Sequence, residues 1–416
     1  MNKILKHPLF SGSIIMFGGG MAANVINYIY HLLMGRILGP IDYGSLASIY
    51  SLIYVVAIVP ISTSFAIVKF ISQAKDKKER GYIYWVLKKF VFWVAVATSL
   101  VLLIISPWVA QYLKIDEFAS VVMIAPMTFL LLMILTNQAA MQGLLRFIGV
   151  VGPGFSSALG KLLFGLFFVA LGFSVNGAVF GILLALIVTY FLSVWLRGNL
   201  FDEKAKAGSF SIQKFLHYAF PVLIQALAFT AFFTVDVLLA KHFLPAFEAG
   251  IYAALSTLGK VIYFAAQPIT AAMFPIVIGK KSRGEAYRGI FFVSFLLTVL
   301  ISILAVSLYW LFPSLAIGIL YGKDYLTAAP SLVWMGLFIG VYTANYILVN
   351  FLLSIERTKI VYLPLAIAVI QVVGINIWHS GIMDIITVSL VSMLILFVGL
   401  SLYMIYTQIP KLYVKN

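Results

Sequence analysis

Long apolar runs separated by short polar turns repeat along the whole chain. Each run has roughly 20 residues or more, the length that an α-helix needs to cross the hydrocarbon core of a bilayer. The strands of a membrane barrel would be about ten residues long and would alternate apolar with polar side chains, and these runs do neither. The pattern therefore predicts an all-α membrane protein with twelve spans, near residues 10–34, 44–72, 90–112, 118–141, 150–172, 176–196, 215–240, 250–278, 289–312, 328–353, 360–378 and 385–407.

The amino-acid composition agrees with this pattern and excludes several kinds of chemistry. Of the 416 residues, 63% are hydrophobic and only 10% are charged, and the mean hydropathy of +1.08 lies outside the range of soluble globular domains. The chain has no cysteine, which excludes disulfides, thiolate metal sites and cysteine nucleophiles. Its five histidines are scattered without zinc-ligand spacing, so we expect neither a metal nor a cofactor.

The net charge of +15 is distributed as expected for a membrane topology. If the N-terminus is cytoplasmic, the twelve spans place most of the 28 Lys and Arg residues on the inside. Those that fall in outer loops are Arg36, Lys114, Lys241 and Lys323. The positive-inside rule thus supports the number of spans and predicts that both termini are cytoplasmic. The basic charge reflects topology, and no nucleic-acid partner is expected.

The most polar interior segment, "RGNLFDEKAKAGSFSIQK", contains the midpoint of the chain. It predicts an N-terminal half over 1–197, a cytoplasmic linker over 198–214 and a C-terminal half over 215–416. Each half has six spans, an even number, so the halves are expected to be parallel repeats. A turn in the first half, "LGPIDYG" at 38–44, returns at an offset of 206 as "LPAFEAG" at 244–250, between the first and second helices of each half.

Several stretches resemble a known family. They are the "DYG" of the first turn with the following "SLASIYSLIYVVAIVPISTSFAIVKFIS", the "QGLLR" after the fourth span, Asp236 late in the seventh, and "AGIYAALSTLGK" opening the eighth. Together they resemble Wzx-type flippases of the multidrug/oligosaccharidyl-lipid/polysaccharide exporter superfamily, from about residue 10 to about residue 400. The resemblance implies two six-helix bundles around a central cavity that rock between inward-open and outward-open states. It also implies an oligosaccharide on an undecaprenyl diphosphate carrier as substrate, carried across a bacterial or archaeal cytoplasmic membrane.

Two lysines lie deep inside predicted spans. Lys161 is about ten residues from either end of the fifth span, and Lys260 is similarly deep in the eighth. A lysine at the bilayer centre costs about 2.5–3.5 kcal/mol on insertion scales, so it normally faces a wet cavity or a partner. One lysine from each half is therefore predicted to neutralise a diphosphate while the head group crosses. The alternative is a structural lysine that is paired with a backbone carbonyl.

The first span carries a polar stripe of Asn24, Asn27, Tyr28 and His31, at i, i+3, i+4 and i+7. This spacing puts the four side chains on one helix face, where amides and hydroxyls suit the hydroxyls of a sugar. The alternative is hydrogen bonding between helices, which is common in membranes. The same two readings apply to Gln225 and, with less weight, to Gln138, Gln142, Thr343, Tyr346 and Asn350.

Two further charged residues have alternative interpretations. Asp236 is the only carboxylate that we place inside a span, and it is a candidate site for a coupling proton or sodium ion. The alternative is an interfacial or salt-bridging acid. Arg36, just outside the first helix, is a candidate for attracting anionic head groups, and an ordinary interfacial anchor is the alternative.

These observations favour a flippase for lipid-linked oligosaccharides, with membrane lipids and a coupling ion as further partners. A cation-coupled multidrug antiporter of the same superfamily is the first alternative, but deep lysines disfavour cationic cargo through like-charge repulsion. A membrane glycosyltransferase or polymerase is the second. It would need an acid or base constellation on a sizeable outer loop, and the longest such loop, near 313–327, is short. The chain is therefore not expected to be an enzyme.

Overall fold

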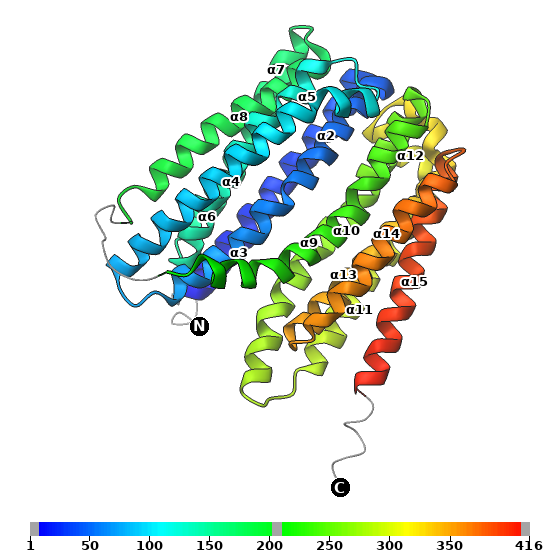
Figure 1. The fold of residues 1–416 in the computed structure, drawn as a ribbon. Coiled ribbons are helices and arrows are strands. Elements are labelled where there is room, and N and C mark those ends of the chain that lie inside the picture. The colour runs from blue at the N-terminus through cyan, green and yellow to red at the C-terminus, as the bar shows by residue number, and fades with distance from the viewer. Residues whose placement is uncertain (1–7, 202–209, 409–416) are drawn as a thin grey trace. The chain divides into compact units, whose positions relative to one another are not determined.

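The computed structural model describes residues 8–201 and 210–408 (Figure 1). Within these ranges every regular element is a helix, and the predicted all-α fold is confirmed. The chain divides into two compact units, one ending at Ala226 and the other beginning at Leu227. The helices of the first unit are α2 (Pro8–Val56), α3 (Ile58–Gln73), α4 (Lys77–Tyr112), α5 (Phe118–Val122), α6 (Ile124–Gly143), α7 (Phe147–Ala170), α8 (Ser174–Arg197) and the first part of α9 (Ile212–Phe243).

The second unit contains the rest of α9 and all the helices that follow it. They are α10 (Ala246–Ser282), α11 (Arg288–Leu311), α12 (Pro313–Leu320), the 3-10 helix η1 (Lys323–Ala328), α13 (Ala329–Ser354), the 3-10 helix η2 (Thr358–Val361), α14 (Tyr362–Ile377) and α15 (Ile382–Gln408). Two of these, α12 and η1, occupy the stretch predicted as the longest outer loop.

The described residues contain eleven helical segments long and apolar enough to span a membrane, and the first of them, Gly18–Gln73, has 56 residues. That length is more than twice the roughly 20 residues that one crossing needs. Its helix α2 is broken at Gly39, whose φ of 72° and ψ of 176° are not helical. Pro40 then starts the second arm, where its missing N–H costs nothing. The break separates two crossings, so the number of spans agrees with the twelve predicted.

Prolines interrupt three of the predicted spans. A proline has no N–H to donate, and its ring clashes with the carbonyl four residues earlier. The second span is interrupted at Ala57, three residues before Pro60, and the fourth at Met123, three residues before Pro126. The eleventh begins as the 3-10 helix η2 just before Pro364. Pro107, Pro153, Pro268 and Pro275 lie inside continuous helices, so a proline within a span does not always interrupt the helix.

Close packing of α7 on α8 organises the first unit, and the first arm of α2 packs on α7 (Figure 1). Two glycines set the distance between α7 and α8. A Cβ atom on Gly181 would lie 2.5 Å from the backbone nitrogen of Gly165. Only helices without side chains at both positions approach this closely, as is common in membrane bundles.

The second unit is built around α13, which contacts α10, α11 and α15. Most of α13 is buried, including Met335, Phe338 and Ile339. Large apolar side chains on the outer faces are exposed instead, such as Trp108 on α4, Phe191 on α8 and Phe292 on α11. Exposed apolar faces of this kind are those that contact lipid.

The boundary between the two units falls inside α9. Residues 202–209 of the predicted linker lie outside the described residues. Phe201 precedes them, and Phe215 and Ala219 follow on α9. All three are buried in one apolar cluster with Ile71 of α3 and Leu87 of α4. The start of α9 is therefore part of the first unit by packing.

Candidate functional site

Lys161 of α7 is buried in the first unit, with only 8% of its surface exposed. Its Nζ lies 4.7 Å from the centre of the Tyr30 ring and 4.9 Å from that of Tyr50. Within the described residues, no carboxylate lies within 4.0 Å of the ammonium, and it donates no hydrogen bond. Two ring faces therefore hold the positive charge, and the ammonium protons stay available to an acceptor.

The break at Gly39 brings these two rings together. Tyr30 belongs to the first arm of α2 and Tyr50 to the second, and their ring centres are 6.0 Å apart. Gly165, one turn after Lys161 on α7, leaves the space that Tyr30 occupies. A Cβ atom there would lie 2.7 Å from Cε2 of Tyr30.

His31 is the member of the polar stripe that joins this cluster. Its ring centre is 4.6 Å from that of Tyr50, and its Nδ1 is 3.4 Å from the Tyr43 hydroxyl. We name Lys161, Tyr30, Tyr50, His31 and Tyr43 the Lys161 cluster. The other stripe members, Asn24, Asn27 and Tyr28, are half-buried on the same arm of α2.

The turn at 38–44 is anchored to the start of α8. The hydroxyl of Ser174 donates a hydrogen bond to the carboxylate of Asp42. Ser174 has a positive φ of 44°, and it begins α8. This bond ties the second arm of α2, which carries Tyr43 and Tyr50, to the α7–α8 pair, which carries Lys161.

Lys260 of α10 is half-buried in the second unit. Its Nζ lies 4.5 Å from the centre of the Phe233 ring on α9. No carboxylate of the described residues is within 4.0 Å, but the charge of Asp236 attracts this lysine from farther away. The second unit, like the first, thus has a lysine that lies over an aromatic ring. Unlike Lys161, this lysine also has an acid, Asp236, near it.

Asp236 is fully buried and is the only buried carboxylate of the described residues. Its Oδ2 accepts a hydrogen bond of 2.7 Å from the Tyr252 hydroxyl, and its Oδ1 has no partner in the described chain. Tyr252, Ser256 and Lys260 follow one another at i, i+4 and i+8, so they share one face of α10. The Ser256 hydroxyl also has no partner in the described chain. We name Asp236, Tyr252, Ser256, Lys260 and Phe233 the Asp236 cluster.

An aromatic group lies beside the Asp236 cluster. Tyr263 is 5.3 Å from Phe233 and 5.2 Å from Tyr346 between ring centres. Tyr342 lies 5.6 Å from Phe233. The remaining α13 candidates bond their own helix: Thr343 donates to the Ile339 carbonyl, and Asn350 to that of Tyr346. Tyr346 is therefore the α13 candidate that joins the aromatic group.

Other candidates lie elsewhere. Arg36 is exposed at the end of the first arm of α2. Gln225 is half-buried on the part of α9 that belongs to the first unit. The Gln138 amide donates to the Val150 carbonyl at 2.7 Å, which is a structural bond between α6 and α7. Among the residues that the structure describes, no three His, Asp or Glu side chains are grouped as metal ligands.

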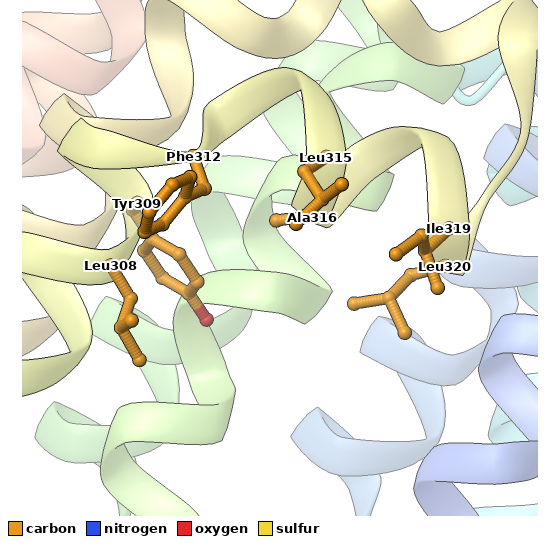
Figure 2. Close-up of a pocket in the computed structure, with 7 residues that line it drawn as sticks. All are labelled: Leu308, Tyr309, Phe312, Leu315, Ala316, Ile319 and Leu320. Atoms are coloured by element: carbon orange, nitrogen blue, oxygen red, sulfur yellow. The ribbon is translucent and has the colours of Figure 1, made fainter.

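An apolar pocket of about 320 Å³ lies between α11 and α12. Figure 2 shows Leu308, Tyr309 and Phe312 on one side, and Leu315, Ala316, Ile319 and Leu320 on the other. The one hydroxyl, that of Tyr309, is already bonded to the Leu258 carbonyl at 2.7 Å. The pocket suits hydrocarbon and has no group for a charged head group.

Sequence reasoning found both lysines and Asp236 but missed the side chains that surround them. The site residues that the sequence predicts do not include Tyr30, Tyr43, Tyr50, Phe233 or Tyr252, although Tyr43 lies in the first turn and Tyr50 and Tyr252 lie in stretches that carry the family resemblance. A signal was available for Tyr252, because its spacing of eight residues from Lys260 puts both on one helix face. With 22 tyrosines and 34 phenylalanines in the chain, composition alone does not select the others.

Comparison with known proteins identifies the family of the chain and solved structures with the same fold. Residues 9–278 match the family described as polysaccharide biosynthesis protein. Among curated protein sequences none matches. A multidrug resistance MATE family transporter of the MOP superfamily, solved in an inward-facing conformation, shares 15% identity and a TM-score of 0.76, over 94% of this chain and 98% of its own.

Two other solved structures share the fold at similarly low identity. The lipid II flippase MurJ, in an inward closed conformation, has 14% identity and a TM-score of 0.74, over 93% of this chain and 86% of its own. A MOP superfamily transporter from Pyrococcus furiosus, for which a reversed polarity of the binding pocket suggests a different function, has 15% identity and a TM-score of 0.63, over 95% of this chain and 94% of its own. These likenesses show that the two-bundle fold is that of MOP superfamily transporters.

Proposed function

Since the chain belongs to the polysaccharide biosynthesis protein family, we propose that it is a flippase that moves oligosaccharide units on an undecaprenyl diphosphate carrier across the cytoplasmic membrane by alternating access. The units would serve surface polysaccharide biosynthesis. The proposed orientation keeps both termini in the cytoplasm of a bacterium or archaeon. The chain moves its substrate without changing a covalent bond.

One observation supports the proposed class of substrate, an oligosaccharide on a diphosphate carrier. In each unit a lysine of a membrane helix rests on aromatic rings, and neither ammonium has a carboxylate within 4.0 Å among the described residues. Charges in this setting are retained where they meet a partner of opposite sign during function. A diphosphate supplies such a partner, and the proposal assigns the neutralisation of its charge to Lys161 and Lys260.

The Lys161 cluster also offers groups for the sugars. His31 and Tyr43 present ring nitrogen and hydroxyl groups beside the lysine, and Asn24 and Asn27 continue the same arm of α2. Aromatic faces of the kind that Tyr30 and Tyr50 provide pack well on the apolar faces of sugar rings. In this proposal the diphosphate binds at Lys161 and the glycan extends along the first arm of α2. Arg36, at the end of that arm, attracts the anionic head group. Gln225 of α9 contributes an amide that hydrogen-bonds the glycan.

Asp236 is the proposed site of the coupling ion, either a proton or a sodium ion. Its Oδ1 lacks a partner in the described chain, and its Oδ2 is fixed by Tyr252. An ion bound at Asp236 would cancel the attraction between this acid and Lys260. Lys260 would then be free to hold a phosphate, which couples ion binding to substrate binding.

The alternative function to be tested is that of a drug antiporter, because MATE transporters share the fold. Expulsion of hydrophobic cations calls for carboxylates, and Asp236 is the only buried one among the described residues. The lysines would repel such cargo. No observation in the structure favours this second function over the first.

A liposome experiment tests the proposal directly. Purified protein is reconstituted with a lipid-linked diphosphate oligosaccharide in both leaflets, and a glycosidase is added outside. In protein-free liposomes the enzyme reaches only the outer leaflet. We expect the inner pool to be depleted as well when the protein is present. An undigested inner pool, together with export of a fluorescent cation from the same vesicles, would refute the flippase and support the antiporter.

A further inference from the structure

A group of basic and aromatic side chains lies where the start of α4 meets the end of α8 in the first unit. Arg197, the last residue of α8, has its guanidinium carbon 5.2 Å from the centre of the Trp85 ring and 5.7 Å from that of Tyr84. Lys88 lies over the same two rings, with Nζ 4.7 Å from the centre of the Trp85 ring and 5.7 Å from that of Tyr84. Arg80 is one turn before Tyr84 on α4.

Buried hydrogen bonds hold Tyr84, one of the two rings, in its position. The Tyr84 hydroxyl donates to Asn137 Oδ1 at 2.7 Å, and Asn137 Nδ2 donates to the Ser193 hydroxyl at 2.9 Å. All three side chains are fully buried, and they join α4, α6 and α8. Phe201 stacks on Tyr84 with ring centres 4.1 Å apart. Tyr84, one of the two rings that carry the basic groups, is therefore held in place by its neighbours.

Three donors in this group have no acceptor in the described chain. They are Nε of Arg80, Nε1 of Trp85 and Nε of Arg197, and each of these atoms is shielded from solvent. No carboxylate of the described residues lies within 4.0 Å of either guanidinium. Buried polar groups are normally paired, and a donor left alone indicates a missing ion, water or ligand. Two guanidinium groups and an indole N–H call for an acceptor with several anionic oxygens.

The positions of Arg80 and Arg197 along their helices indicate that the ligand is a lipid. Arg80 is in the first turn of α4, which opens with the exposed Lys77 and Lys78, and Arg197 ends α8. These helix ends are at the boundary between membrane and water, the layer in which tryptophan is enriched and lipid phosphates lie. Basic pockets between membrane helices at this depth suit phosphate head groups.

We propose that Arg80, Trp85 and Arg197 form a binding site for a phosphate-bearing lipid head group at this end of the first unit. The site is separate from the Lys161 cluster and does not depend on the proposed transport function. Its ligand is either a resident anionic phospholipid or the diphosphate of an isoprenoid carrier waiting to be transported. Both present the same phosphate oxygens to the three donors.

The test measures lipid binding to delipidated, detergent-purified full-length protein. Phosphatidylglycerol, undecaprenyl diphosphate, inorganic phosphate and a diacylglycerol that lacks phosphate are titrated separately, and the bound lipid is identified by native mass spectrometry. The variant is Arg80→Gln with Arg197→Gln. The matched control is Lys77→Gln with Lys78→Gln, which removes the same charge from exposed positions of the same helix.

We expect a phosphate-bearing lipid to bind the wild type and the control, with binding about tenfold or more weaker in the double variant, because hydrogen bonds to charged groups are lost. Binding of phosphatidylglycerol would identify a resident phospholipid, and preference for undecaprenyl diphosphate would identify the carrier. Equal affinity in wild type and double variant would overturn the proposal, as would an equal loss in the control or equal binding of the diacylglycerol. Saturation by inorganic phosphate at the same concentration would overturn the assignment to a lipid.

A second variant keeps the test decisive if the double variant does not fold. Trp85→Phe retains an aromatic ring for Arg197 and Lys88, and it removes the unpaired N–H together with part of the indole ring. We expect folded protein whose affinity for the lipid is reduced severalfold. An unchanged affinity of Trp85→Phe for the lipid would show that the indole N–H does not contact the head group. This result would overturn the proposed site.

Discussion

Lys161 Nζ lies 4.7 Å from the centre of the Tyr30 ring, between two arms of one broken helix. The ring reaches this position because residue 165, one turn along α7 from the lysine, is a glycine. The contact thus depends on three separate stretches of chain: the polar stripe region, the break at Gly39 and a glycine of α7.

Gly165→Ala is predicted to displace Tyr30 from Lys161. The new Cβ would lie 2.7 Å from Tyr30 Cε2, so the ring must move. Because a cation–π contact contributes about 0.5–2 kcal/mol, we expect flipping in the liposome assay to fall by about two- to thirtyfold. Gly154→Ala on the same helix meets open space and is the control. Normal flipping by Gly165→Ala would show that the ring contact is not needed.

Replacing both lysines, Lys161→Gln with Lys260→Gln, is predicted to abolish flipping and to leave folded protein in the membrane. Glutamine keeps a polar side chain, one atom shorter than lysine, but removes the charge that neutralises the diphosphate. The liposome assay gives the activity, and size-exclusion chromatography in detergent gives the folded fraction. Each single variant is expected to retain partial activity. Full activity of the double variant would remove the lysine mechanism and leave the family assignment intact.

Gly181→Ala is predicted to destabilise the first unit by separating α7 from α8. Its Cβ would lie 2.5 Å from the backbone nitrogen of Gly165, and backbone does not move aside as a flexible side chain does. Overpacking of this kind costs about 1–3 kcal/mol. We expect a lower midpoint of thermal unfolding in detergent, with Gly154→Ala unchanged. An unaltered midpoint would mean that the two helices separate without cost.

Asp236→Asn is predicted to uncouple transport from the ion gradient. The amide oxygen still accepts the hydrogen bond from Tyr252, but the side chain no longer binds a proton or attracts Lys260. We expect downhill flipping to persist and its acceleration by an imposed gradient to disappear. Separate proton and sodium gradients across wild-type liposomes identify the ion. A variant that responds to the gradient as the wild type does would exclude Asp236 as the coupling site.

Asn137→Ala is predicted to loosen the junction of α4, α6 and α8. It leaves the Tyr84 hydroxyl and the Ser193 hydroxyl without their shared partner in a buried place. Hydrogen bonds between membrane helices contribute about 0.6–1.7 kcal/mol each, so a loss of about 1–3 kcal/mol is expected for the two. Asn376→Ala is the control, because that amide is exposed and bonds its own helix. Equal unfolding midpoints for the two variants would contradict this role.

The sequence by itself determined the helices. Apolar runs long enough to span the membrane fixed their number, because an unpaired backbone polar group is too costly in lipid for another structure to form. This effect is local, so reading along the chain was enough. The sequence does not determine where the helices break: Gly39 with Pro40, and the prolines at 60, 126 and 364, accompany interruptions, whereas Pro107, Pro153, Pro268 and Pro275 lie inside continuous helices.

The sequence also singled out Lys161, Lys260 and Asp236, because a charge inside an apolar run is conspicuous and expensive. Only the tertiary structure decided which side chains surround them. Periodicity tells which residues share one face of a helix, but the face that it meets depends on how helices pack. Tyr30 and Tyr50 meet Lys161 because Gly39 breaks α2 and Gly165 leaves room, and neither effect can be read from the apolar pattern that places the tyrosines in the membrane. The unpaired donors of Arg80, Trp85 and Arg197 likewise became visible only once the end of α8 was placed near the start of α4.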